Sequence, residues 1–185
     1  MALLKSEQKL ETGGRAPDFS LKGVDGKTHS LQDFAPSRFL LVVFMCNHCP
    51  FVKQKIQTLI QLQSDYKDRG LQVVGINAND AAAYPDDSFE NMIAFAQDQG
   101  LNFPYLIDDT QDTARAYGAV CTPDPFLFDD NRALVYQGRI DDALDLGGTA
   151  THNDMAEALD HLLAGLAPPV AFKHSMGCSI KWKQD

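Results

Sequence analysis

The chain has 185 residues, 44% of them hydrophobic, which is enough to bury the core of one compact domain without disulfide staples. Its formal net charge of −9 leaves no basic surface for phosphates and excludes nucleic acid as an expected partner. Because the N-terminus has no basic and apolar signal segment, and no apolar run is long enough to span a membrane, we expect a cytoplasmic protein with no membrane partner.

The first predicted elements are a hairpin and a buried strand. The turn pair Asp25-Gly26 lies between two short segments with apolar residues, which predicts an N-terminal β-hairpin formed by residues 18–21 and 27–31. Residues 38–45, with the sequence RFLLVVFM, form a nearly continuous apolar run of strand length. Such a run is typical of a central strand that is covered on both faces.

A helix is predicted directly after this strand, because apolar residues recur at helical spacing over 50–69 and Gly70 lies where a C-cap glycine belongs. The Pro168-Pro169 pair near the other end of the chain predicts the start of an irregular tail. Between them the patterns predict a strand at 71–76, a helix at 88–99, a strand at 103–107, a helix at 110–117, a hairpin of 126–128 with 133–136, and a helix at 153–163.

This alternation predicts an α/β fold in which helices flank a central mixed sheet, with the N-terminal hairpin as an extension. The whole chain, 1–185, is expected to form one domain, with a core of about 16–165 and a C-terminal tail over 167–185.

The segment Cys46-Asn47-His48-Cys49 falls between the predicted central strand and the following helix. That position brings the first sulfur close to the unpaired N–H groups and the positive dipole end of the helix, which favours a thiolate. We therefore predict Cys46 as a nucleophile, with His48 as a supporting neighbour and Cys49 as the resolving thiol. The plainer interpretations are two apolar core cysteines and an exposed loop histidine.

A second motif, Cys121-Thr122-Pro123, leads into a predicted strand well downstream. The order of strand, CxxC, helix and then a Thr-Pro step resembles the thioredoxin superfamily. In that superfamily the proline is cis and its loop faces the cysteine pair. The resemblance implies that Pro123 lies beside Cys46 and Cys49 and that Thr122 contacts the backbone of an extended substrate. The alternative is a trans proline that starts a strand.

Most of the chain is similar to the redoxin branch of this superfamily, which includes the alkyl hydroperoxide reductase and thiol-specific antioxidant proteins. A narrower resemblance is to peroxiredoxin-like thioredoxin-family proteins. The resemblance implies a thioredoxin-like fold. The segments that carry it are APDF at 16–19, CNHCPFVK at 46–53, GINAND at 75–80, GRIDD at 138–142 and GCSIKWK at 177–183.

The chain departs from the peroxiredoxin pattern at three positions. When Cys49 is aligned with the peroxide-reactive cysteine, Val42 replaces the motif proline, Cys46 replaces the Thr or Ser, and Pro123 lies at about the position of the arginine. Because those hydroxyl and guanidinium groups polarise the peroxide, their absence favours disulfide exchange. We therefore predict a thiol-disulfide oxidoreductase, with a thiol-dependent peroxidase acting on hydroperoxides as the alternative.

The expected partners are protein or small-molecule disulfides and thiols, together with an external thiol reductant, and no cofactor is expected. Cys121 and Cys178 are candidate auxiliary thiols, although a small buried residue and a lone tail cysteine are the plainer interpretations. Copper or zinc binding by Cys46, His48 and Cys49 is an alternative of another class, but the lack of a second CxxC argues against a resident metal.

Overall fold

Residues 3–184 are described by the computed structural model, in which strands and helices alternate. In chain order the elements are β1 (Leu3–Lys5), β2 (Ser20–Gly23), β3 (Thr28–Ser30), η1 (Leu31–Phe34), β4 (Phe39–Phe44), α1 (Pro50–Tyr66), η2 (Lys67–Arg69), β5 (Leu71–Asn77), η3 (Pro85–Asp87), α2 (Phe89–Gln99), β6 (Tyr105–Ile107), α3 (Asp112–Tyr117), β7 (Cys121–Thr122), β8 (Asp124–Phe128), β9 (Leu134–Gly138), α4 (Asp154–Leu163), β10 (Phe172–Lys173) and β11 (Met176–Ser179).

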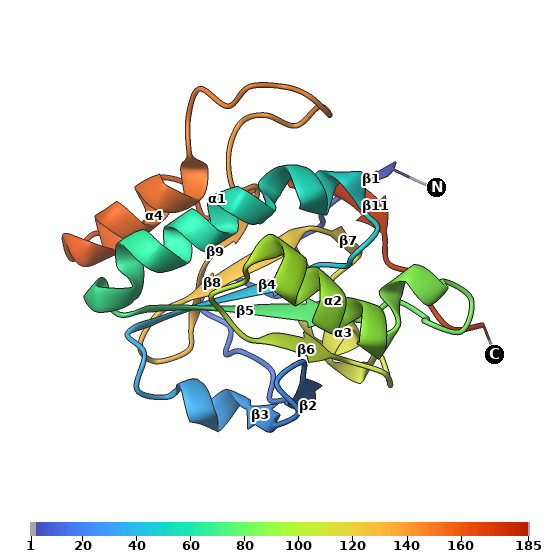
Figure 1. The fold of residues 1–185 in the computed structure, drawn as a ribbon. Coiled ribbons are helices and arrows are strands. Elements are labelled where there is room, and N and C mark those ends of the chain that lie inside the picture. Colours follow the sequence, from blue (N-terminus) through green and yellow to red (C-terminus); the bar gives the residue numbers. More distant parts are fainter. Residues whose placement is uncertain (1–2, 185) are drawn as a thin grey trace.

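These strands form two sheets. The larger is mixed, with eight strands in the order β10-β9-β8-β4-β5-β6-β2-β3, and the smaller has three in the order β1-β11-β7. Figure 1 shows α1 and α4 side by side above the large sheet, with η1 on the opposite side. The predicted mixed α/β fold with its N-terminal hairpin, β2 paired antiparallel to β3, is confirmed.

β4 is the central strand because its apolar side chains find partners on both faces. It runs parallel to β5 and antiparallel to β8, and all six of its residues are buried. Alternate side chains of a strand point to opposite faces. Leu41 and Val43 therefore pack in the cluster that includes α1, α2 and α4, while Leu40 and Val42 pack with Phe34 and α3. This packing fixes the end of β4, from which the CxxC segment starts.

Helix α1 begins directly after the motif. Cys49 is its N-cap residue and Pro50 occupies the first turn, where the missing N–H of proline costs no helical hydrogen bond. Val52 and Ile56 lie on the face buried against the sheet. After a short 3-10 turn the chain reverses at Gly70, whose φ of +98° is the left-handed conformation that glycine adopts readily. The helix thus starts at the motif and ends as predicted.

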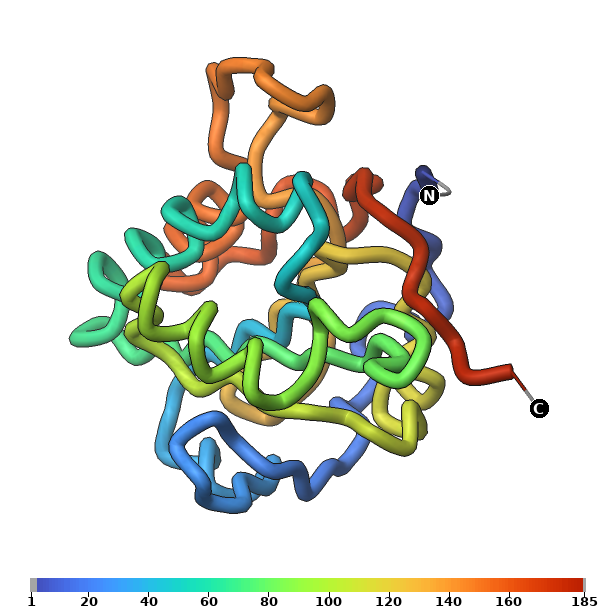
Figure 2. Tube along the Cα trace, turned by 45° about the vertical axis from the view of Figure 1, so that its right-hand side comes forward, coloured from blue at the N-terminus to red at the C-terminus, as the bar shows by residue number. Residues whose placement is uncertain are grey.

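The C-terminal tail differs from the prediction, because it is not irregular throughout. β10 pairs parallel with β9, and β11 lies between β1 and β7 in the small sheet. Figure 2 shows the red C-terminal segment passing beside the blue N-terminal segment. These strands have two and four residues, too few for an alternating pattern to stand out in the sequence.

Within residues 3–184, no helix combines the length and the apolar character needed to cross a membrane. The cytoplasmic location and the single-domain organisation with a core of about 16–165 remain predictions.

Candidate active site

The two cysteines of the CxxC segment lie together at the junction of β4 and α1. Cys46 follows β4 after one residue, and Cys49 caps the first turn of α1. Their thiols interact directly enough for each to shift the pKa of the other. Both residues have 0% of their surface exposed, so the dithiol is closed to solvent in this structure.

The Thr122-Pro123 step lies directly against this dithiol. The Thr122-Pro123 peptide bond is cis, as the resemblance to thioredoxins implied. The Thr122 hydroxyl is 3.4 Å from Cys46 Sγ, and the Thr122 carbonyl oxygen is 3.1 Å from Cys49 Sγ. The structure therefore brings together Cys46, Cys49, Thr122 and Pro123, which the sequence placed in two separate motifs.

A third thiol reaches the same site from the C-terminal tail. Cys178 in β11 is 2% exposed, and its Sγ lies 2.9 Å from Cys49 Sγ. β11 pairs antiparallel with β7, and in this register Cys178 is opposite Thr122. The tail thus lies beside both Cys49 and the Thr-Pro loop.

A buried carboxylate, Asp87, closes the other side of the motif. It is 0% exposed and lies at the end of η3, 40 residues after Asn47. One Asp87 oxygen accepts the Asn47 backbone N–H at 2.8 Å, and the other accepts the Asn79 amide at 2.7 Å. The Tyr105 hydroxyl completes the network by donating to Asn47 Oδ1 at 2.9 Å. The conformation of the CxxC loop is therefore held by groups from three other segments.

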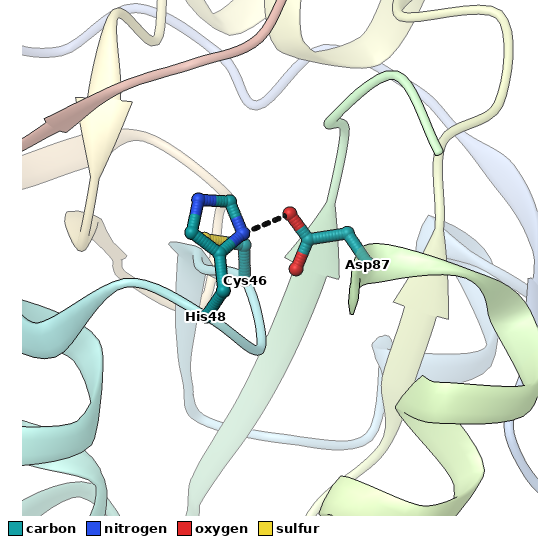
Figure 3. A group of neighbouring side chains, drawn as sticks. All are labelled: Cys46, His48 and Asp87. Carbon is teal, nitrogen blue, oxygen red and sulfur yellow. Dashed lines mark ion pairs between the residues drawn. The ribbon is translucent and has the colours of Figure 1, made fainter. Parts of the chain in front are cut away.

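His48 points from the loop toward the same carboxylate. Figure 3 shows its imidazole next to Asp87, with Cys46 behind the ring. Its Nδ1 is 2.7 Å from Asp87 Oδ2, although the ring N–H is not aligned for a regular hydrogen bond. The imidazole ring of His48 also stacks on the ring of Tyr84, with ring centroids 6.0 Å apart. His48 thus contacts a buried acid, and it is not the fully exposed loop residue of the plainer interpretation.

The two motif thiols shift each other's pKa in opposite directions. The hydrogen bond from the Cys46 thiol, aided by the Cys178 thiol, lowers the pKa of Cys49 to about 5. The same Cys46–Cys49 hydrogen bond, together with burial and the charge of Asp87, raises the pKa of Cys46 well above its ordinary value. The role of Cys46 as the nucleophile remains a prediction. In this closed arrangement its thiol interacts with Cys49 and lies near the charge of the buried Asp87, which the sequence did not reveal.

The fourth cysteine, Cys121, does not join the site. Its Sγ lies 3.8 Å from the Ser175 hydroxyl and 3.9 Å from the Pro123 carbonyl oxygen, and its side chain is fully buried. Burial raises the pKa of the Cys121 thiol far above its ordinary value, with the charge of Asp124 as a further cause. Its role as an auxiliary thiol remains a prediction.

One candidate ligand group is present among residues 3–184 at this site. Cys46, His48 and Asp87 each offer an atom, and these atoms lie within 4.8 Å of one another. The set differs from the predicted Cys46, His48 and Cys49. The oxygens of Asp87 already accept the Asn47 N–H and the Asn79 amide, and His48 closes directly on the carboxylate. These donors are therefore engaged within the protein, so we propose no metal site here.

Sequence reasoning missed Asp87 and Tyr105. Asp87 belongs to the run YPDDS, whose proline and serine indicate the start of a helix. Nothing in that run marks one aspartate as buried and its neighbour Asp86 as exposed. In the GRIDD segment, Asp142 orders its loop by accepting hydrogen bonds from Thr151.

Comparison with known proteins places this arrangement in a family. The model of the AhpC/TSA family matches residues 12–137, a stretch that includes both the CxxC segment and the Thr-Pro step. The chain belongs to the AhpC/TSA family. The predicted redoxin resemblance, and with it an oxidoreductase acting on thiols, is confirmed at this level.

The AhpC/TSA chain has similar relatives in bacteria. It is 33% identical over 156 residues to the thioredoxin-like protein YneN of Bacillus subtilis, covering 84% of this chain and 83% of the relative. It is 25% identical over 131 residues to the thiol-disulfide oxidoreductase ResA of Bacillus thuringiensis, covering 71% of each. A crystal structure of an uncharacterized conserved protein from Geobacillus kaustophilus matches with a TM-score of 0.94 and 43% identity, covering 100% of this chain and 98% of the other.

Proposed function

We propose that the protein exchanges disulfides with protein or small-molecule substrates through the Cys46–Cys49 dithiol. The observation that carries this proposal is the contact of both sulfurs with the Thr122-Pro123 loop, at 3.4 Å from the Thr122 hydroxyl and 3.1 Å from its carbonyl oxygen. Two hydrogen-bonded thiols at the N-terminus of a helix are positioned to form a disulfide with each other and to break one in a partner.

We assign the attacking role to Cys49, because its pKa is lowered to about 5, which favours the thiolate from which disulfide exchange starts. The Cys49 thiolate attacks one sulfur of a substrate disulfide, and the other substrate sulfur leaves as a thiolate that takes up a proton. Cys46 then attacks Cys49 Sγ, loses its proton and releases the first substrate half as a thiol. The products are the Cys46–Cys49 disulfide and a reduced substrate, and an external dithiol restores the enzyme.

The supporting residues have separate tasks in this proposal. Thr122 and Pro123 form the wall against which a substrate segment would lie. His48 and Asp87 hold the loop between the two cysteines, since the Asn47 backbone N–H is fixed by the carboxylate. Asp87 is therefore a positioning residue, because its contacts are with the loop that carries the sulfurs.

The test is the reduction of insulin by dithiothreitol, followed by turbidity. We expect the wild-type protein to accelerate the reaction. Because Cys178 Sγ also lies 2.9 Å from Cys49 Sγ, we expect Cys49→Ser and the double variant Cys46→Ser, Cys178→Ser to fall to the rate of the reductant alone. Cys121→Ser is the matched control, because Cys121 is equally buried and its sulfur contacts Ser175 and Pro123 instead of the dithiol. Full activity of Cys49→Ser or of the double variant would overturn the proposal.

Hydrogen peroxide consumption separates the proposed activity from peroxidase activity. A peroxidase needs donors that polarise the O–O bond. We expect the wild-type protein to consume peroxide no faster than an ordinary thiolate does at the same pH. Rapid consumption that depends on Cys49 alone and survives in Cys46→Ser would replace the disulfide exchange proposal with a thiol-dependent peroxidase.

A further inference from the structure

The C-terminal strand occupies the edge at which a substrate strand would be expected. β11 pairs antiparallel with β7, so that Ser179 faces Cys121 and Cys178 faces Thr122. Thr122 is the residue that touches both motif sulfurs. An extended peptide that adds to a sheet edge uses the same backbone groups that β11 now engages. The chain's own tail therefore lies where a substrate segment would bind.

Backbone contact between the two strands is unusually close at Gly177. A Cβ built on this residue would overlap the Thr122 carbonyl group, so the tail can approach the loop only with glycine at this position. On its other edge β11 is paired with β1, where Leu3 faces Cys178. The segment after β11 is anchored as well, since Lys181 N–H donates to Asn79 Oδ1 at 2.9 Å.

This placement directs one sulfur at the dithiol. Cys178 Sγ is 2.9 Å from Cys49 Sγ. Cys49 thus has two thiol neighbours, Cys46 within its own motif and Cys178 from a strand 129 residues later. Both can reach the sulfur that the proposed mechanism places in the mixed disulfide.

We propose that β11 is an intramolecular substrate strand and that Cys178 is a second resolving thiol for Cys49, which forms a Cys49–Cys178 disulfide. This inference rests on the proposed disulfide exchange activity and extends it. While β11 is docked, external substrates are excluded from both motif sulfurs, which are 0% exposed. In this proposal an oxidised Cys49 can form a disulfide with Cys178 in place of Cys46.

The exchange balances in two ways. When Cys49 carries a mixed disulfide with a substrate, Cys178 attacks Cys49 Sγ, the Cys49–Cys178 bond forms, and the substrate leaves as a thiol with the proton from Cys178. When the enzyme holds the Cys46–Cys49 disulfide, the same attack breaks that bond and Cys46 becomes the thiol. The second reaction only moves the disulfide, so it consumes no oxidant or reductant.

Oxidised glutathione tests the inference in the Cys46→Ser protein. The first glutathione half joins Cys49 and the second leaves as a thiol, and Cys178 then releases the first half. After blocking of remaining thiols, trypsin gives separate peptides 39–53, 116–132 and 174–181 that carry the motif, Cys121 and Cys178. We expect peptides 39–53 and 174–181 to be joined by a disulfide in most of the protein.

Matched variants make the result specific. The double variant Cys46→Ser, Cys178→Ser should stop at the glutathione adduct of Cys49, whereas Cys46→Ser, Cys121→Ser should still give the joined peptides. A glutathione adduct as the main product in Cys46→Ser would overturn the inference. In the wild-type protein, redox buffers of rising potential supply a second measurement, because the joined peptides should appear there beside the Cys46–Cys49 disulfide, and their absence at every potential would also overturn it.

Failure of this inference is distinguishable from failure of the proposed function. If the wild-type protein reduces insulin but no joined peptides form, disulfide exchange stands and Cys178 is no resolving thiol. If the joined peptides form but insulin reduction is not accelerated, the internal disulfide stands and exchange with external substrates is excluded.

Discussion

The two sides of Cys49 are built by different means. On the Cys46 side, a buried carboxylate and its polar neighbours fix the loop, with Asp87 accepting hydrogen bonds from Asn47 and Asn79. On the Cys178 side, short strands pair through their backbones, and Cys178 Sγ contacts Cys49 Sγ. One thiol neighbour is therefore held by a network within the folded core, and the other by a short strand between β1 and β7.

This difference gives the two sides of Cys49 different functions. The hydrogen bonds that Asp87 and Tyr105 make to the loop form a buried polar network, so the Cys46 side determines the ionisation and orientation of the dithiol. A four-residue strand held by backbone pairing to two short neighbours can open locally at a cost below that of global unfolding, so the Cys178 side determines access. Each side can be weakened separately, and the expected effects differ in kind as well as in size.

The largest expected effect is on the ionisation of Cys49. The Cys46 hydrogen bond is the main cause of its low pKa, so Cys46→Ala should raise the pKa of Cys49 from about 5 towards the ordinary value of 9.0. Cys178→Ala should raise it less, because that hydrogen bond is a smaller cause. The thiolate absorbance at 240 nm, followed from pH 4 to pH 10, measures both midpoints.

The same titration also gives the result that would contradict a thiolate at Cys49. In the wild-type protein the thiolate should form as pH rises through about 5, and alkylation of Cys49 should rise over the same range and then level off. Cys121→Ala serves as the control and should leave the midpoint unchanged. A midpoint near 5 in Cys49→Ser would assign the thiolate to Cys46, as the sequence alone predicted.

The next effect concerns stability on the Cys46 side. Asp87→Asn keeps the size of the buried side chain but turns one acceptor into a donor, which then faces the Asn79 amide. Leaving buried polar groups unsatisfied costs about 1–3 kcal/mol, and more when a charge partner is lost. We expect a loss of about 3 kcal/mol in the free energy of unfolding, measured by urea denaturation.

Asp86→Asn is the matched control for that measurement. The two aspartates are adjacent in η3, but the Asp86 side chain is exposed and only its backbone carbonyl accepts the Asn47 amide. Its substitution should change the free energy of unfolding by less than about 0.5 kcal/mol. Equal effects of the two substitutions would mean that the buried carboxylate does not hold the loop.

Much of the Cys46 side could be predicted because its signals are local. The run at 38–45 is apolar on both faces, so it indicated a central strand, and the helical spacing after Pro50 placed Cys49 at a helix N-terminus. Pro123 was placed by resemblance, and the cis bond at that position agrees with it. These features depend on neighbours in the sequence or on a motif of known geometry.

The rest depends on contacts between distant segments. Asp87 and Asp86 have the same chemistry and adjacent positions, and only the packing of η3 against the motif decides which is buried. The return of Cys178 to Cys49 depends on a four-residue strand held between β1 and β7. Neither the burial of Asp87 nor the pairing of β11 leaves a periodic pattern in so few residues, and the ionisation of the cysteines depends on both.

On the Cys178 side, Gly177→Ala should open the site. The added methyl overlaps the Thr122 carbonyl, so β11 must shift from β7, at a cost of about 1–3 kcal/mol for overpacking. If local opening limits access, a weakening of about 1.4 kcal/mol raises the alkylation rate of the motif cysteines about tenfold. The measurement is iodoacetamide labelling of peptide 39–53 by mass spectrometry.

Gly148→Ala controls for the general effect of replacing a glycine. Its nearest neighbour would be the Asp145 carbonyl oxygen at 3.1 Å, in an exposed loop away from the small sheet. Labelling should stay at the wild-type rate in this control. A Gly177→Ala protein that is labelled as slowly as the wild type would show that β11 does not limit access to the dithiol.

The smallest effect is expected at the edge of the polar network. Tyr105→Phe removes the hydroxyl that donates to Asn47 Oδ1, and the amide oxygen is then left without this donor in a site that is 6% exposed. The loss should be about 1 kcal/mol in the free energy of unfolding. Tyr84→Phe is the control, since Tyr84 is 42% exposed and its ring remains to stack on His48.

Because the hydroxyl of Tyr105 supports the loop and not β11, iodoacetamide labelling of Cys49 should change much less than in Gly177→Ala. If Tyr105→Phe increases labelling as strongly as Gly177→Ala, the loop network also controls access to the dithiol. The two sides of Cys49 would then not have separate functions.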